Sequence, residues 1–108
     1  MALAGLVAAW RTELSLRVEA AIAVVVIGLG WWLEVSRTDW LWIVAAIAWV
    51  FICEYVNTAL ERLVDTVSPG YSAQAGHIKD VASAAVLIAA AAAALIGLLV
   101  FVPYLQKI

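Results

Sequence analysis

Three long apolar stretches constrain this chain more than any other feature, because each is long enough to cross a lipid bilayer. They run approximately over residues 14–33, 40–64 and 81–104. A hydrocarbon core about 30 Å thick needs roughly 20 helical residues, and each stretch meets that length. Hydrophobic residues make up 68% of the chain and charged residues 13%, whereas soluble domains are about 45–50% apolar and about 25% charged. The sequence therefore predicts an all-α membrane protein with three transmembrane helices.

Polar segments and breakers mark the ends of these spans. Residues 34–39 form a short polar turn, and the breaker 68–71 opens a loop that we expect to continue to Gly76. Because short hairpins join the spans and no repeat is visible, we predict a single domain over 1–108. Aromatic residues flank the first turn as an interfacial belt would: Trp31, Trp32, Trp40 and Trp42, with Pro103 and Tyr104 ending the last helix nearby.

The segment before the first span has two interpretations. It carries apolar residues at helical spacing, namely Leu3, Leu6, Val7 and Trp10. Either the first span starts early, or a short amphipathic helix lies on the membrane surface. The fold prediction includes the interfacial helix. No basic region precedes this apolar stretch, so we do not expect a cleaved signal peptide.

Basic residues near the span ends predict the orientation. Four lie on one side of the membrane, and Arg37 and Lys107 lie on the other; the four are Arg11, Arg17, Arg62 and Lys79. This excess places the N-terminus and the 66–78 loop in the cytoplasm. The net charge of −2 argues against a nucleic-acid partner. Cys53 is the one cysteine, which excludes an intrachain disulfide, and we interpret it as a small buried hydrophobe.

The second span carries an unusual polar stripe, which consists of Glu54, Asn57, Glu61 and Asp65. These residues fall within an arc of roughly 80° on a helix and rise about 16 Å along it. A carboxylate inside a span costs about 3 kcal/mol, so it is normally paired, solvated or functional. A helix end in water explains Asp65 adequately. It explains Glu54 poorly, because Glu54 lies about ten residues inside the span end and is flanked by apolar residues.

Two further polar groups lie on the same side of the membrane. Glu13 and Arg17 are spaced i,i+4 on the first predicted helix, with Glu19 after them; alone, they suit a solvated ion pair. Residues 77–80 open the third span, where Asp80 would complement the helix dipole and Lys79 would reach the surface. Together with the stripe they provide carboxylates for a hard cation and a lysine for phosphate. That set suits a magnesium–nucleotide site.

Other site types have no matching motif in the sequence. There is no P-loop or GxGxxG, no His/Cys cluster for zinc, and no GxSxG. The residues alone leave two alternatives to a kinase. One is a small ion-conducting protein whose stripe carries protons or cations, and the other is a packing subunit whose polar residues fix assembly.

Three blocks of this sequence resemble the prokaryotic diacylglycerol/undecaprenol kinases. Residues 54–65, EYVNTALERLVD, resemble the family pattern E-x-x-N-[ST]-A-[IL]-E-x-[VL]-V-D. Residues 75–87, AGHIKDVASAAVL, are similar to its A-K-D block and the following A-V-L run, and residues 10–19, WRTELSLRVE, to E-x-x-F-R-x-E. The blocks follow in the family's order and spacing.

The resemblance implies a homotrimeric lipid kinase of the bacterial inner membrane, with active sites at protomer boundaries facing the cytoplasm. ATP would be the phosphate donor and Mg²⁺ the cofactor. Glu54 would be the general base, and Glu13 and Glu61 would hold the metal. The remaining residues would bind or support the substrates: Asn57, Asp65, Lys79, Asp80, Arg17 and Glu19.

Two features bear on activity and substrate. The first ten residues carry no basic side chain, whereas family members commonly have a longer basic surface helix, so we expect weaker phosphate binding or a shortened N-terminus. Residues 57–58 and 67–69 resemble the undecaprenol branch, and residues 83–87 the diacylglycerol branch. Diacylglycerol is the expected lipid partner, with undecaprenol as the alternative.

Overall fold

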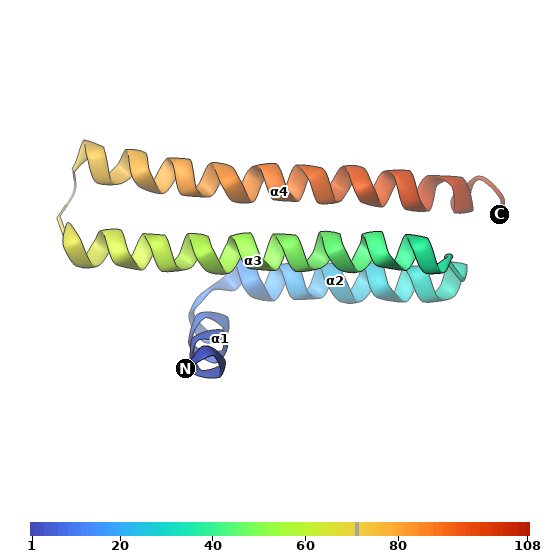
Figure 1. Cartoon of the computed structure of the whole chain (residues 1–108), viewed down its shortest axis with the longest axis horizontal. Coiled ribbons are helices and arrows are strands. Elements are labelled where there is room, and N and C mark those ends of the chain that lie inside the picture. Colours follow the sequence, from blue (N-terminus) through green and yellow to red (C-terminus); the bar gives the residue numbers. More distant parts are fainter. Residues whose placement is uncertain (71) are drawn as a thin grey trace.

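The chain folds into helices that lie largely side by side. The computed structural model describes residues 1–70 and 72–108, and the backbone of these residues forms helices and no strand. The helices are α1 (Ala2–Thr12), α2 (Leu14–Leu33), α3 (Arg37–Val67) and α4 (Ala73–Leu105). Figure 1 shows α2, α3 and α4 running along one axis while α1 lies across it. The all-α prediction is confirmed, and Tyr71 of the predicted breaker lies outside the described residues.

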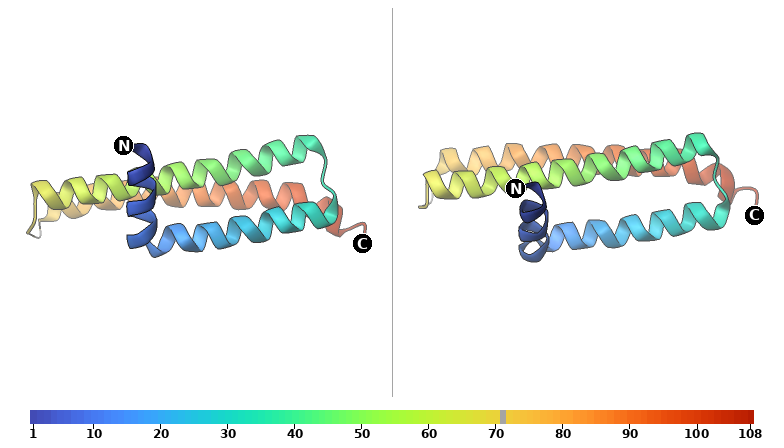
Figure 2. Two further views of the ribbon diagram at one scale, coloured as in Figure 1. Left: turned by 90° about the horizontal axis from the view of Figure 1, so that it is seen from below. Right: turned by 60° about the horizontal axis from the view of Figure 1, so that its bottom comes forward.

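Three of the helices are long and apolar enough to cross a membrane, namely α2, α3 and α4. The 20 residues of α2 correspond to about 30 Å, which matches one bilayer core. The 31 residues of α3 and 33 of α4 correspond to about 46 and 50 Å. The additional length projects past α1 at the end where α3 and α4 are joined (Figures 1 and 2). The α3–α4 hairpin therefore extends beyond the span that α2 defines.

The short helix α1 is separate from α2 and crosses the bundle. Glu13 has extended backbone angles, φ −109 and ψ 109, and so interrupts the helix between α1 and α2. The Tyr55 hydroxyl donates a hydrogen bond to the Leu6 carbonyl oxygen at 3.0 Å, which fixes α1 against α3. Figure 2 shows α1 crossing the other helices rather than continuing α2. This arrangement suits a helix lying in the membrane surface and confirms the predicted interfacial helix.

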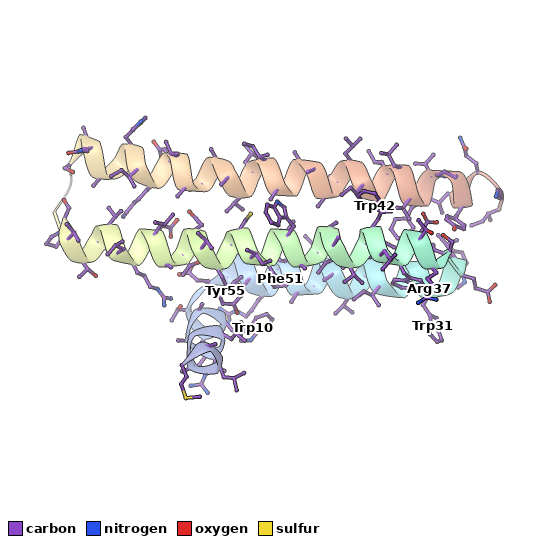
Figure 3. The ribbon with its side chains drawn as sticks, viewed as in Figure 1. Trp10, Trp31, Arg37, Trp42, Phe51 and Tyr55 are labelled. Carbon is purple, nitrogen blue, oxygen red and sulfur yellow. The ribbon has the colours of Figure 1, made fainter. Side chains whose placement is uncertain are left out.

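Aromatic side chains mark two levels along the bundle. In Figure 3, Trp10 and Tyr55 lie where α1 meets α3, and Trp31 and Trp42 lie at the opposite end. Tryptophan and tyrosine concentrate at both membrane–water interfaces. The two levels are separated by about the length of α2, so the aromatic residues and the helix lengths indicate the same membrane position.

Close packing is concentrated away from α1. α3 and α4 share the longest contact, whereas α2 contacts mainly α3. A core of Val35, Ile43, Val100 and Phe101 lies near the α2–α3 turn. Gly30 packs against the Trp40 indole so closely that a Cβ atom there would lie 2.8 Å from a ring carbon. Many large apolar side chains elsewhere are exposed, as expected for a surface that faces lipid.

The turn between α2 and α3 is fixed by side-chain hydrogen bonds. Glu34 ends α2 in the left-handed conformation with φ 54. The Ser36 side chain caps α3 by accepting from the Asp39 backbone N–H at 3.1 Å. The Tyr104 hydroxyl accepts from the Ser36 backbone N–H at 2.9 Å and donates to the Asp39 carboxylate. The end of α4 is thereby tied to the start of α3.

The turn between α3 and α4 is shorter than the sequence predicts. The expected loop to residue 76 is wrong, because α4 begins at Ala73. The Ser72 hydroxyl accepts from the Ala75 backbone N–H at 3.0 Å and so provides an N-cap. Asp80 consequently lies two turns inside α4, so the alternative in which it complements the helix N-terminus does not hold.

Candidate active site

The exposure of the predicted stripe on α3 increases along its length, from Glu54 to Asp65. Glu54 is buried, with 7% of its surface exposed. Asn57 and Glu61 are partly buried, and Asp65 is exposed. The helical spacing therefore places one end of the stripe inside the protein and the other on the projecting α3–α4 hairpin. A lipid headgroup and a water-soluble nucleotide would meet along such a gradient.

Glu54 lies at the level of α1, beside the start of α2. The Ser15 hydroxyl donates a hydrogen bond to Glu54 Oε2 at 3.2 Å. The next residue, Tyr55, is the one that binds α1, as Figure 3 shows. A buried carboxylate is thus held where the membrane surface meets the protein.

Asn57 and Glu61 form the middle of the stripe. The Asn57 amide nitrogen donates to Glu61 Oε1 at 3.1 Å. The other half of that amide, Asn57 Oδ1, is buried without a hydrogen-bond partner among the described residues. Leaving a buried acceptor unpaired is costly. A buried oxygen without a donor among the described residues is available to a ligand such as a cation.

Glu13 does not pair with Arg17, so the solvated i,i+4 ion pair considered as an alternative to a site role is not formed. Glu13 is the extended residue between α1 and α2, and helical spacing does not apply to it. Its carboxylate instead lies 3.5 Å from Arg62 Nη2 on α3. The same nitrogen donates to the Thr12 hydroxyl. Arg17 lies exposed on α2. Glu13 is therefore brought against α3 at Arg62, the residue that follows Glu61.

Asp65 and Lys79 meet on the projecting hairpin. The Lys79 ammonium forms an ion pair with Asp65 Oδ1, which joins α3 to α4 at the outer end of the stripe. The side chains of Lys79 and Asp65 are 37% and 62% exposed, so such a pair contributes about 1 kcal/mol or less. Asp80 is exposed beside it on α4. A weak, open pair can exchange partners when a charged ligand binds.

The carboxylates suit a magnesium ion only in part. No group of three or more His, Cys, Asp or Glu side chains is close enough to hold a metal among the described residues. Mg²⁺, however, is commonly held by one or two carboxylates together with substrate phosphates. Glu61 and the Asn57 amide lie together on α3, and Glu13 approaches α3 at Arg62. The donor set therefore fits a metal that arrives with a nucleotide.

An apolar cavity of about 350 Å³ opens between α2, α3 and α4. Glu19 is among its lining residues, and most of the others are apolar, including Phe51, Gly97 and Phe101. The cavity exists because α2 packs on α3 and leaves space beside α4. Glu19 is its charged lining residue, so the cavity suits a hydrocarbon chain whose headgroup lies toward Glu19.

Comparison with known proteins gives the family. Residues 1–101 match the prokaryotic diacylglycerol kinases. The chain belongs to the prokaryotic diacylglycerol kinase family. It is 37% identical to the undecaprenol kinase of Bacillus subtilis over 95 residues, covering 88% of this chain and 77% of that protein. It is 35% identical to the diacylglycerol kinase of Escherichia coli K12 over 85 residues, covering 79% and 70%.

Membership of this kinase family confirms the predicted enzyme class. A third relative, the diacylglycerol kinase of Pseudomonas aeruginosa, is 36% identical over 87 residues, covering 81% of this chain and 71% of that protein. The chain is a lipid kinase, and ATP is the phosphate donor of this class. The family favours this function over ion conduction or a pure packing role, which the stripe alone left open.

Three residues that the sequence reasoning did not assign to the site touch its members or its supports. Ser15 holds Glu54, Arg62 holds Glu13, and Tyr55 holds α1. Arg62 directly follows Glu61 and lies roughly 60° from the edge of the stripe. This closeness of Arg62 to the stripe was a sequence signal from which a role in the site could have been predicted. Ser15 gave none, because its contact depends on how α2 packs against α3.

Proposed function

We propose that the chain transfers the γ-phosphate of ATP to the hydroxyl of diacylglycerol, giving phosphatidic acid. The observation that carries this proposal is the buried Glu54 carboxylate at the level of α1, at the inner end of a stripe that leads out to the projecting hairpin. A lipid hydroxyl lies at the membrane surface, and ATP arrives from water. The stripe spans the distance between these two substrates.

Glu54 is the general base of the proposed reaction. The lipid hydroxyl oxygen attacks the γ-phosphorus, its proton passes to the Glu54 carboxylate, and the bond from phosphorus to the β–γ bridging oxygen breaks to release ADP. A positioned base contributes about 10²–10⁴-fold to a rate. Ser15 orients the carboxylate through its hydrogen bond to Oε2. Asn57 orients Glu61 or the substrate from one turn away.

The outer half of the site binds the nucleotide. Glu13 and Glu61 are the residues that would hold Mg²⁺, which would supply positive charge to neutralise the phosphates. Lys79 exchanges Asp65 for phosphate oxygens, since their pair is exposed and weak. The remaining proposed residues contact the nucleotide or support the site, namely Asp65, Asp80, Arg17 and Glu19.

The site faces the cytoplasm of a bacterial inner membrane, and the protein works as a homotrimer. The excess of basic residues near the α1 end supports this orientation. The trimer, with sites at protomer boundaries, follows the family resemblance. Chemical crosslinking of the detergent-solubilised protein tests it, with a three-chain product expected.

Undecaprenol is the second candidate substrate. The 37% identity to the Bacillus subtilis undecaprenol kinase favours it, and the apolar cavity suits either lipid. An assay of the purified protein with ATP and Mg²⁺ tests the choice by offering diacylglycerol and undecaprenol side by side. We expect diacylglycerol to have the higher kcat/KM. A higher value for undecaprenol would replace the substrate, and turnover of neither lipid would refute the proposed function.

A further inference from the structure

We propose that Arg62 is a nucleotide-binding residue of this chain, and that its guanidinium contacts the phosphates of ATP. This inference rests on the proposed function and names a residue that lies outside the sites predicted from the sequence. The relevant structure is the junction of α1 and α2, where Arg62 reaches across from α3.

Arg62 lies among the proposed metal ligands. It directly follows Glu61 on α3, and its Nη2 atom lies 3.5 Å from Glu13 Oε1. The same atom donates to the Thr12 hydroxyl. The Arg62 side chain is 48% exposed, so it is accessible from the water side. A cation therefore lies beside Glu13 and next in sequence to Glu61, the two carboxylates that would hold magnesium.

Arg62 is also at the right depth for the reacting phosphate. It lies eight residues from Glu54, or about 12 Å along the helix. The Asp65–Lys79 pair begins three residues further out, about 4.5 Å beyond Arg62. Its guanidinium contacts Glu13, which lies two residues before Ser15, the residue whose hydroxyl binds Glu54. Arg62 is thus nearer than Lys79 to the position that the γ-phosphate must take.

Binding of the nucleotide would exchange the partners of these charges. The Glu13 carboxylate cannot serve both the guanidinium and a metal ion at full strength, so Glu13 turns to the metal and Arg62 to the phosphate. A guanidinium has five N–H donors and binds phosphate through two parallel hydrogen bonds. Both contacts of Arg62 within the described residues use Nη2. The other donors make no contact within this part of the chain, which leaves them to engage phosphate oxygens.

Binding of a non-hydrolysable ATP analogue to the purified full-length protein tests the proposal, together with steady-state kinetics. We expect Arg62→Ala to raise the Kd of the analogue and the KM for ATP about tenfold, with the KM for the lipid unchanged. Arg62→Lys should restore part of the affinity. Thr12→Val is the matched control, because it removes the neighbouring contact and keeps the charge, and it should leave both constants unchanged.

A structural role for Arg62 gives a different pattern. If Arg62 only fastens the α1–α2 junction, Thr12→Val and Arg62→Ala would change the constants alike, or neither would change them, and the proposal would be overturned. Thermal unfolding of each variant identifies any loss of folding. If Arg62→Ala does not fold, the Kd and KM of Arg62→Lys decide between the two roles. If the unaltered protein phosphorylates lipid and Arg62→Ala keeps a normal KM for ATP, this inference alone would be overturned. Analogue binding that depends on Arg62, without phosphorylation of any lipid, would overturn the proposed function alone.

Discussion

Replacing Glu54 by glutamine separates catalysis from folding more cleanly than any other change in this protein. Glutamine has nearly the same shape, and its amide oxygen can still accept the hydrogen bond from Ser15, which is 3.2 Å long in the unaltered protein. Glutamine cannot take a proton from the lipid hydroxyl. Because Glu54 is only 7% exposed, water has little access to replace the lost base.

The expected loss follows from the contribution of a general base. We expect kcat to fall about 10²–10⁴-fold, which corresponds to about 3–5 kcal/mol of transition-state stabilisation. The KM for ATP should stay within about threefold, because the nucleotide lies toward Glu61 and Asp65. Stability should change by about 1 kcal/mol or less, since a buried neutral amide replaces a carboxylate without loss of volume.

Initial rates in mixed micelles at saturating ATP and lipid measure the effect. Glu34→Gln is the control, because it removes a carboxylate at the opposite end of the bundle and should leave kcat unchanged. Size-exclusion chromatography reports whether the oligomer survives. A kcat for Glu54→Gln within about threefold of the unaltered enzyme would refute the assigned base. Loss of the oligomer would instead indicate that Glu54 fixes assembly.

Three further predictions concern packing and the cofactor. Gly30→Ala should destabilise the protein by about 1–3 kcal/mol, because its Cβ would lie 2.8 Å from the Trp40 ring. Gly28→Ala is the control and should not destabilise the protein, because the space around Gly28 is open. Thermal unfolding in detergent measures both. Tyr104→Phe removes the hydroxyl that binds Asp39 and should cost about 1–2 kcal/mol with kcat unchanged. Chelation of divalent cations should abolish turnover and added Mg²⁺ should restore it; unchanged turnover in the chelator would contradict the metal site.

The fold was largely predictable because its main determinants are local. Apolar runs of bilayer length fix three spans, and the structure extends them by a few residues, as in α3 from Arg37 to Val67. The largest error is at the start of α4. The sequence predicts a loop through Gly76, but the Ser72 cap and the neighbouring alanines support a helix there. One glycine costs a helix only about 1 kcal/mol.

The site was predictable along one helix and not between helices. Helical spacing on α3 places Glu54 and Glu61 on one face, and the structure keeps that order of exposure. Glu13 was assigned to a regular helix, but it lies at the break between α1 and α2 and pairs with Arg62. The contact of Ser15 with Glu54 likewise depends on tertiary packing, which no spacing rule encodes.

Transfer of labelled γ-phosphate from ATP to a lipid alcohol in liposomes tests the central claim most directly. The protein is reconstituted with diacylglycerol and undecaprenol, and ion flux is followed in the same vesicles. If the protein is a lipid kinase, label appears in a phosphorylated lipid, this labelling requires Mg²⁺ and Glu54, and no ion flux occurs. Flux with no labelled lipid and no consumption of ATP would contradict the account and show that the polar stripe of α3 serves ions instead.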